Sequence, residues 1–250
     1  MQSKNNLNSI RLNKYIASCG IGSRREADDL IKSGVVEVND RVAVTPGVSV
    51  TEKDTVKVRG KVIKPEQKDY IIFNKPGGYI TSGKDEKGRK TIYDILPDKF
   101  RNLKPAGRLD KDSTGLLILT NDGDLIQQLT HPKKMVPKIY RVIAEGKVKE
   151  QDLLKFKRGI EIEKGKIAYA EAVILDYANS VTTLEMVLYQ GYNRQIRRML
   201  EKTGHPVVAL KRIAHGCIEL GSLDKGKFKY LNKKETQNLK NYLNKIKTAK

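Results

Sequence analysis

The stretch GRLDKDSTGLLILTNDG, residues 107–123, decides the fold of the larger part of this chain. Its apolar run from Leu116 to Leu119 is too short for a typical helix and is bounded by turn residues, so it predicts a buried strand. A glycine-bracketed loop carrying Arg108 and Asp110 leads into this strand. Because loops on a rigid scaffold often hold catalytic side chains, Asp110 is a candidate catalytic residue. The plainer interpretation is a loop carboxylate paired with Arg108.

The composition favours a nucleic acid as partner. The chain has 250 residues, 49 Lys and Arg against 29 Asp and Glu, a formal net charge of +20 and a sequence pI of about 9.8. Such an excess of positive charge favours association with polyanions. No apolar run approaches the length of a membrane-spanning helix, and the first residues lack the apolar core of a signal peptide. We therefore expect a cytoplasmic protein that does not bind membranes.

The sequence offers no set of residues typical of a metal site. Cys19 and Cys217 are far apart in the sequence, and the three histidines are dispersed. Residues 78–85 nearly spell a phosphate-binding loop, but Asp85 stands where a Ser or Thr would be needed to bind magnesium. We expect no metal, and we exclude a nucleotide-hydrolysing function.

The N-terminal part predicts a small helical module. Residues 11–19 have helical spacing and are followed by glycines that end a helix. Ser23 and Glu26 have the spacing of a capping box, which predicts that a second helix begins there. Valines alternate with polar residues from Val36 onward, and Asn39-Asp40 favours a hairpin turn.

This module, RLNKYIASCGIGSRREADDLIKSGVVEVND at residues 11–40, resembles the S4 RNA-binding domain, and we place the domain at residues 8–59. In that family the basic face of the two helices and the hairpin grip RNA phosphates. Arg24 and Arg25 fall in the first turn of a helix, where the helix dipole favours an external phosphate over a cation. An ordinary solvated face is the alternative. The resemblance implies RNA contacts for Arg11, Lys14, Ser23, Arg24, Arg25 and Lys32.

Residues 60–69 are rich in lysine and predict a linker, so we place a second domain at residues 70–250. An apolar strand from Tyr70 would open it. Apolar residues in segments 167–175 and 181–189 predict a hairpin, which indicates antiparallel pairing.

Three segments of the second domain resemble the pseudouridine synthases of the ribosomal small-subunit type. Residues 107–123 look like that family's active-site motif, whose catalytic Asp follows Gly-Arg-Leu. Lys138 and Tyr140 match a Lys-x-Tyr motif. GYNRQIRRM at residues 191–199 matches a third signature, with Tyr192 where the family commonly has Arg.

The resemblance implies a role for each matching residue. Asp110 would be catalytic, Tyr140 would stack on the target uracil, and Arg197 would pair with the catalytic Asp. Arg108 would fill the space that the flipped base leaves, because such an enzyme must take the base out of the stack. Further RNA contacts are expected for Arg194, Lys211 and Arg212.

These features predict an α+β protein with a small S4-like domain and a catalytic domain built on a mostly antiparallel mixed sheet. The resemblance implies site-specific isomerisation of uridine to pseudouridine in ribosomal RNA by a monomer without any cofactor. Segments 85–90 and 130–132 look more like the large-subunit enzymes, which favours 23S over 16S rRNA. A 16S enzyme and a non-catalytic RNA-binding assembly factor are the alternatives. The substrate could be free rRNA or an assembly intermediate.

Overall fold

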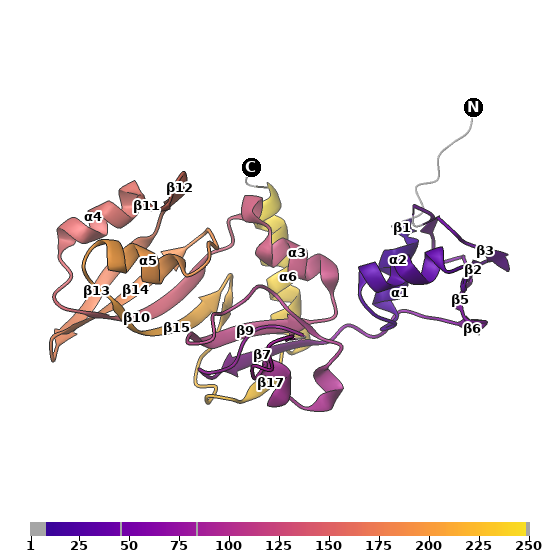
Figure 1. The fold of residues 1–250 in the computed structure, drawn as a ribbon, viewed down its shortest axis with the longest axis horizontal. Coiled ribbons are helices and arrows are strands. Elements are labelled where there is room, and N and C mark those ends of the chain that lie inside the picture. The colour runs from indigo at the N-terminus through magenta and orange to yellow at the C-terminus, as the bar shows by residue number, and fades with distance from the viewer. Residues whose placement is uncertain (1–8, 46, 84, 249–250) are drawn as a thin grey trace. The chain divides into compact units, whose positions relative to one another are not determined.

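The computed structural model describes residues 9–45, 47–83 and 85–248. It divides the chain into two units, Met1–Lys68 and Asp69–Lys250 (Figure 1). Buried residues of the first unit form one hydrophobic cluster, and those of the second unit form others. Each unit therefore has its own core.

The first unit packs two helices against short strands. The strands β3-β2-β5-β6 form an antiparallel sheet in that order, and β1 pairs with β4. Leu12 and Ile16 of the first helix and Ile31 of the second are fully buried, which confirms the predicted helical spacing. The elements are β1 (Ile10–Arg11), α1 (Leu12–Ser18), α2 (Arg24–Lys32), β2 (Val36–Val38), β3 (Arg41–Val42), β4 (Ser49–Val50), β5 (Val56–Val58) and β6 (Lys61–Val62).

Local hydrogen bonds explain where α2 begins and how the hairpin turns. The Glu26 amide donates to Ser23 Oγ at 3.3 Å, and the Ser23 amide donates to the Glu26 carboxylate at 2.6 Å, so the predicted capping box is present. Asn39 and Asp40 both have positive φ, as a tight turn between β2 and β3 requires.

The stretch predicted as a linker is largely part of the first unit. Strand β6 lies within it and pairs with β5, and Ile63 packs against the core. The Glu66 amide also donates to the carbonyl of Ser18 at 2.9 Å. The high lysine content suggested a solvated connection, but a two-residue edge strand needs few apolar side chains. The boundary between the units falls after Lys68.

The second unit is built on one large sheet in the order β13-β14-β10-β15-β9-β7-β17, with β16 beside β15 and β8 beside β9. Within the part of the chain that the structure describes, its neighbouring strands are antiparallel except for β9 and β15, which confirms a mostly antiparallel sheet. Its strands are β7 (Tyr70–Lys75), β8 (Lys104–Pro105), β9 (Thr114–Thr120), β10 (Lys138–Glu145), β13 (Glu171–Ala178), β14 (Val181–Leu188), β15 (Val207–His215), β16 (Ile218–Glu219) and β17 (Phe228–Tyr230).

Helices cover the sheet in two groups (Figure 1). Helices α4 and α5 pack with β10, β14 and β15 around Phe156 and Met199, while α3 and α6 pack with β7 and β9 around Leu129 and Leu239. The helices are α3 (Gly123–Thr130), α4 (Glu150–Arg158), α5 (Gln195–Lys202) and α6 (Lys233–Thr248), with short 3-10 turns at Ile92–Asp94, Asp98–Phe100 and Pro132–Lys134. No helix of the described ranges is long and apolar enough to span a bilayer.

Strands β7 and β9 are buried on both faces. Ile72 and Ile118 face the cluster of α3 and α6, whereas Phe73 and Leu117 pack on the opposite side against a cluster that includes Phe100. This double coverage explains why both strands read as continuous apolar runs rather than alternating ones.

The predicted hairpin starts later than expected. Strand β13 pairs with β14, but Lys166–Ala168 forms β12, which pairs with β11 (Ile160–Glu163) instead. The chain changes partner near Ala170, whose amide donates to the carbonyl of Phe156 at 3.1 Å. Apolar alternation continues through this point, so it does not reveal the change of partner.

Candidate active site

The loop that carries Asp110 joins β8 to β9 at the edge where β9 begins. Asp110 is half-buried, Leu109 is buried and Arg108 is exposed. The Ser113 amide donates to the Asp110 carbonyl at 3.1 Å, which closes a turn around the carboxylate. Within the described residues the Asp110 side chain forms no ion pair.

Lys75 anchors this loop through hydrogen bonds to its backbone, although no sequence motif had singled out Lys75. It is the last residue of β7 and is fully buried. Its ammonium donates to the carbonyls of Ser113 at 2.8 Å, Asp110 at 3.1 Å and Lys111 at 3.2 Å, and to that of Pro76 at 3.0 Å. The sequence did contain one indication of this role, because Lys75 ends an apolar strand just before a Pro-Gly-Gly turn.

The surroundings of Lys75 shift its pKa. Burial lowers the pKa of Lys75 to about 8, although the nearby carboxylates of Asp112 and Asp110 act in the opposite direction. The charged form is the one that supplies three N–H groups to the loop.

The register of three strands brings Tyr140 toward the same loop. Gly115 of β9 is the partner of Arg212 in β15, and Arg212 is the partner of Tyr140 in β10. Two strand spacings of about 4.8 Å place the Tyr140 backbone about 10 Å from that of Gly115. Tyr140 is half-buried and packs against the cluster beneath α5. The register thus places Tyr140 two strands away from the start of β9, the strand into which the Asp110 loop leads.

Arg197 reaches the loop but contacts its backbone. Its guanidinium donates to the carbonyl of Asp112 at 3.5 Å and to that of Val207 at 3.2 Å. Within the described residues no ion pair joins Arg197 to Asp110, in contrast to the direct pairing that the family motif implied. Arg197 therefore ties helix α5 to the loop that carries the candidate carboxylate.

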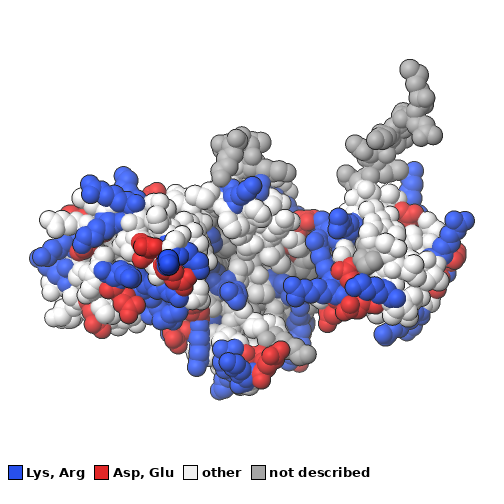
Figure 2. All heavy atoms as spheres, turned by 45° about the horizontal axis from the view of Figure 1, so that its top comes forward, with Lys and Arg blue, Asp and Glu red and all other residues white. Residues whose placement is uncertain are grey.

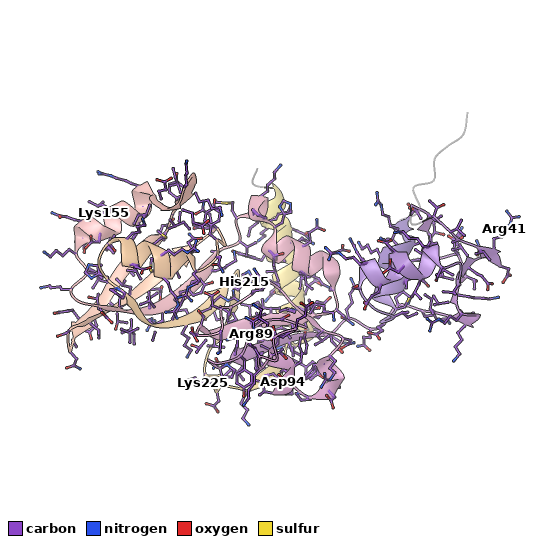
Figure 3. All side chains as sticks on the ribbon, viewed as in Figure 1. Arg41, Arg89, Asp94, Lys155, His215 and Lys225 are labelled. Atoms are coloured by element: carbon purple, nitrogen blue, oxygen red, sulfur yellow. The ribbon has the colours of Figure 1, made fainter. Side chains whose placement is uncertain are left out.

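Arg212 belongs to the interior, which corrects the expectation that it contacts RNA. It is 1% exposed, and its Nε donates to the carbonyl of Leu116 at 2.7 Å. Burial, together with the charge of Arg212, lowers the pKa of Lys138 to about 8. The same two causes lower the pKa of His215, which lies inside the unit (Figure 3). Leu210 and Arg212 are two residues apart in β15 and so share the buried face, whereas Lys211 between them is exposed. The expectation had followed the charge of Arg212 and not this alternation.

The other candidate RNA contacts lie at the surface. Arg194, with a left-handed backbone at the start of α5, and Lys211 are exposed. In the first unit Lys14 is half-buried, and Ser23 is exposed with its hydroxyl already accepting from Glu26. Basic side chains outnumber acidic ones on the face shown in Figure 2. The remaining exposed candidates are Arg11, Arg24, Arg25 and Lys32.

Within the described ranges, no three His, Cys, Asp or Glu side chains lie close enough together to hold a metal ion. The arrangement offers the half-buried Asp110, the half-buried aromatic ring of Tyr140 and exposed basic side chains. These features, on an α+β domain that follows a small basic module, define a candidate RNA-modifying enzyme.

Comparison with known proteins identifies the family. Residues 69–202 match the RNA pseudouridylate synthase family and residues 10–56 match the S4 domain. An RNA pseudouridine synthase of Aquifex aeolicus is 43% identical over 232 residues, covering 92% of this chain and 93% of that protein. Ribosomal large subunit pseudouridine synthase B of Bacillus subtilis is 39% identical, covering 92% and 95%.

A solved structure agrees with these relatives. The crystal structure of a pseudouridylate synthase has a TM-score of 0.67 and 29% identity, covering 92% of this chain and 99% of that one. The chain belongs to the RNA pseudouridine synthase family and carries an N-terminal S4 domain. It is an enzyme of the isomerase class, as the active-site motif implied.

The pKa of Lys75 predicts a pH dependence of the reaction. Above a pH of about 8 the neutral amine has two N–H groups for four carbonyl oxygens, so we expect the single-turnover rate to fall as the pH rises through this value. Lys75→Met should be slow at every pH and lack this decline. Lys138→Met is the control and should keep the decline. The pKa of Lys138 is also about 8, but its ammonium donates to the carbonyl of Val136 and not to the Asp110 loop.

The free energy of unfolding should rise with pH over the range in which the reaction rate falls. In the same pH range the unfolded chain keeps a proton on this lysine that the folded chain has lost, so the free energy of unfolding rises with pH until tyrosines ionise near about pH 10. A rate that fell only together with stability, or a decline that survived in Lys75→Met, would contradict the assignment.

Proposed function

We propose that this protein converts one uridine of 23S ribosomal RNA to pseudouridine, as a monomer in the cytoplasm. The Bacillus subtilis relative named as a large-subunit enzyme supports the choice of rRNA, because its similarity extends over nearly the whole of both chains. The observation that best supports the proposed chemistry is how Asp110 is held in its loop. Its backbone is fixed by Lys75, while its carboxylate has no ion pair within the described residues.

The reaction breaks the bond between uracil N1 and ribose C1′, rotates the base, and joins C5 to the same carbon. C5 loses its proton in this last step and N1 gains one, so no atom is lost overall. The base must first leave the stack, which costs a few kcal/mol. Arg108 is exposed beside Asp110 and is our candidate to fill the vacated space, and Tyr140 is our candidate to receive the ring. Asp110 acts as nucleophile or base. Arg197 brings a positive charge to the Asp110 loop through its bond to Asp112.

Electrostatic contacts supply the grip on RNA. We propose that the exposed basic residues of the S4 unit, together with Arg194 and Lys211, neutralise phosphates. Binding should then weaken steeply with salt, and each substitution that removes one phosphate-binding side chain should reduce the salt slope by about 0.7–0.9. Arg24 and Arg25 are the pair to replace first, because both are exposed in the first turn of α2.

Mapping of pseudouridine in 16S and 23S rRNA tests the proposal. RNA from cells that have the protein is compared with RNA from cells that lack it, and with RNA from cells in which the wild-type gene is restored. Loss of modification at one 23S position, recovered on restoration, is the expected result. Loss at a 16S position would move the substrate to the small subunit. Unchanged maps in both rRNAs would contradict the proposal.

Replacement of Tyr140 tests the receiving surface. Because stacking of a base on an aromatic ring contributes about 1–3 kcal/mol, Tyr140→Leu should lower the rate constant divided by the RNA dissociation constant by about 5- to 150-fold. Tyr177→Leu is the matched control, since Tyr177 is an exposed aromatic of edge strand β13. Equal losses in the two variants would remove the special role of Tyr140.

A further inference from the structure

Thr81 contacts the residue immediately before Asp110 in two ways. Its hydroxyl accepts a hydrogen bond from the Leu109 amide at 3.2 Å and donates one to the Leu109 carbonyl at 2.9 Å. The side chain is buried, with 7% of the residue exposed. The donor and one of the two acceptor sites of the hydroxyl are thus used on the backbone of one loop residue, which ties this side chain to the loop.

Thr81 is itself held by the fold. The neighbouring Ile80 forms a bridge with Thr91, where its amide donates to the Lys90 carbonyl at 2.9 Å and its carbonyl accepts from the Ile92 amide at 3.1 Å. Ile92 is fully buried in the cluster that covers one face of β7 and β9. The hydroxyl therefore reaches the loop from an anchored position.

The loop is fixed on both sides of Asp110. Thr81 holds Leu109, which precedes it, and the Gly78 amide donates to the carbonyl of Lys111, which follows it, at 2.9 Å. Lys75 bonds the carbonyl of Asp110 itself. Because these contacts come from three different positions of one segment, the direction of the Asp110 side chain depends on all of them.

We propose that Thr81 is a positioning residue for the isomerisation, which sets the direction in which the Asp110 carboxylate points. The proposal rests on the function proposed above for Asp110. A reacting group displaced by about 1 Å can slow a reaction by about 10²-fold, so a hydroxyl that orients the preceding peptide controls the rate without touching the substrate.

The test compares Thr81→Val, Thr81→Ser and Thr120→Val in the full-length protein. Thr120 is the matched control, because its buried hydroxyl also bridges the backbone: it donates to the Asp69 carbonyl at 2.6 Å and accepts from the Asp122 amide at 3.0 Å. It lies at the other end of β9, about 20 Å along the strand from Thr114. Each variant is measured for single-turnover pseudouridine formation in a 23S rRNA transcript, for transcript affinity and for thermal unfolding.

We expect Thr81→Val to lower the single-turnover rate by about 10- to 100-fold and to change the affinity for the transcript by less than about twofold. Thr81→Ser keeps the hydroxyl and should recover most of the rate. Thr120→Val should lose a similar amount of thermal stability and keep its rate. If Thr81→Val does not fold, Thr81→Cys, which has a weaker donor, provides the same comparison.

A Thr81→Val enzyme with the wild-type rate would overturn the proposal, as would equal slowing in Thr81→Val and Thr120→Val at matched loss of stability. These results differ from failure of the proposed function, in which the wild-type protein itself would form no pseudouridine.

Discussion

Asp110→Asn is expected to abolish pseudouridine formation, lowering the single-turnover rate by at least about 10³-fold, because an amide can act neither as a nucleophile nor as a base. The loop itself should survive the change. Its bonds to Lys75 and Ser113 use the Asp110 main-chain carbonyl rather than the side chain. The affinity for RNA should stay the same or rise slightly, since a carboxylate near phosphates opposes binding.

Asp112→Asn is the matched control for this variant. Asp112 lies on the same loop with its residue exposed, and its carbonyl is what Arg197 contacts. Replacing an exposed side chain of this kind usually changes a free energy by about 0.5 kcal/mol or less. Because the Asp112 carboxylate also raises the pKa of Lys75, the comparison is made well below a pH of about 8, where Lys75 is charged, and the rate should then change by less than about threefold. If Asp110→Asn kept its rate while Asp112→Asn lost it, the catalytic carboxylate would be Asp112. If Asp110→Asn lost its grip on RNA, the carboxylate would have a binding role instead.

Gly115→Ala is expected to have the largest effect on stability. Gly115 has a φ of +102°, and a Cβ at this position would lie 2.2 Å from the carbonyl oxygen of Arg212. That oxygen belongs to the backbone of β15, which is held between β9 and β10 and has little freedom to move. Overpacking together with backbone strain should cost about 3–5 kcal/mol, a large part of the total stability of a domain.

Gly165→Ala separates the two causes of this effect. Gly165 also has positive φ, but a Cβ there would meet nothing within 4 Å. It should lose only the cost of the backbone conformation, about 1 kcal/mol. Denaturant unfolding of both variants measures the difference. Equal stabilities of Gly115→Ala and Gly165→Ala would show that β15 can move away from β9, and catalytic activity should then be retained.

The sequence predicted those parts of the fold that local patterns specify. The capping box at Ser23, the turn at Asn39-Asp40 and the apolar run of β9 each depend on neighbouring residues, and each is found as expected. Pairing between distant segments was harder to predict from the sequence. The change of partner near Ala170 and the strand at Lys61–Val62 depend on what packs beside them, which the local pattern does not contain.

In the candidate site, too, local motifs were predictable from the sequence and contacts between distant segments were not. Motif resemblance predicted roles for Asp110, Tyr140 and Arg197, and the strand register places Tyr140 two strands away from the start of β9. Lys75 and Thr81 were missed because their contacts are with main-chain carbonyls and amides, which look alike in every sequence. Arg212 was misplaced because exposure is decided by the direction of a strand's side chains and not by charge.

The parallel contact between β9 and β15 also bears on how the enzyme is made. Gly115 meets Arg212 across nearly a hundred intervening residues, so this contact closes a long chain segment and contributes to a high contact order. During synthesis, β15 leaves the ribosome well after the Asp110 loop. A nascent or truncated chain can therefore complete its S4 unit early, while the active site is completed late, when most of the chain has been translated.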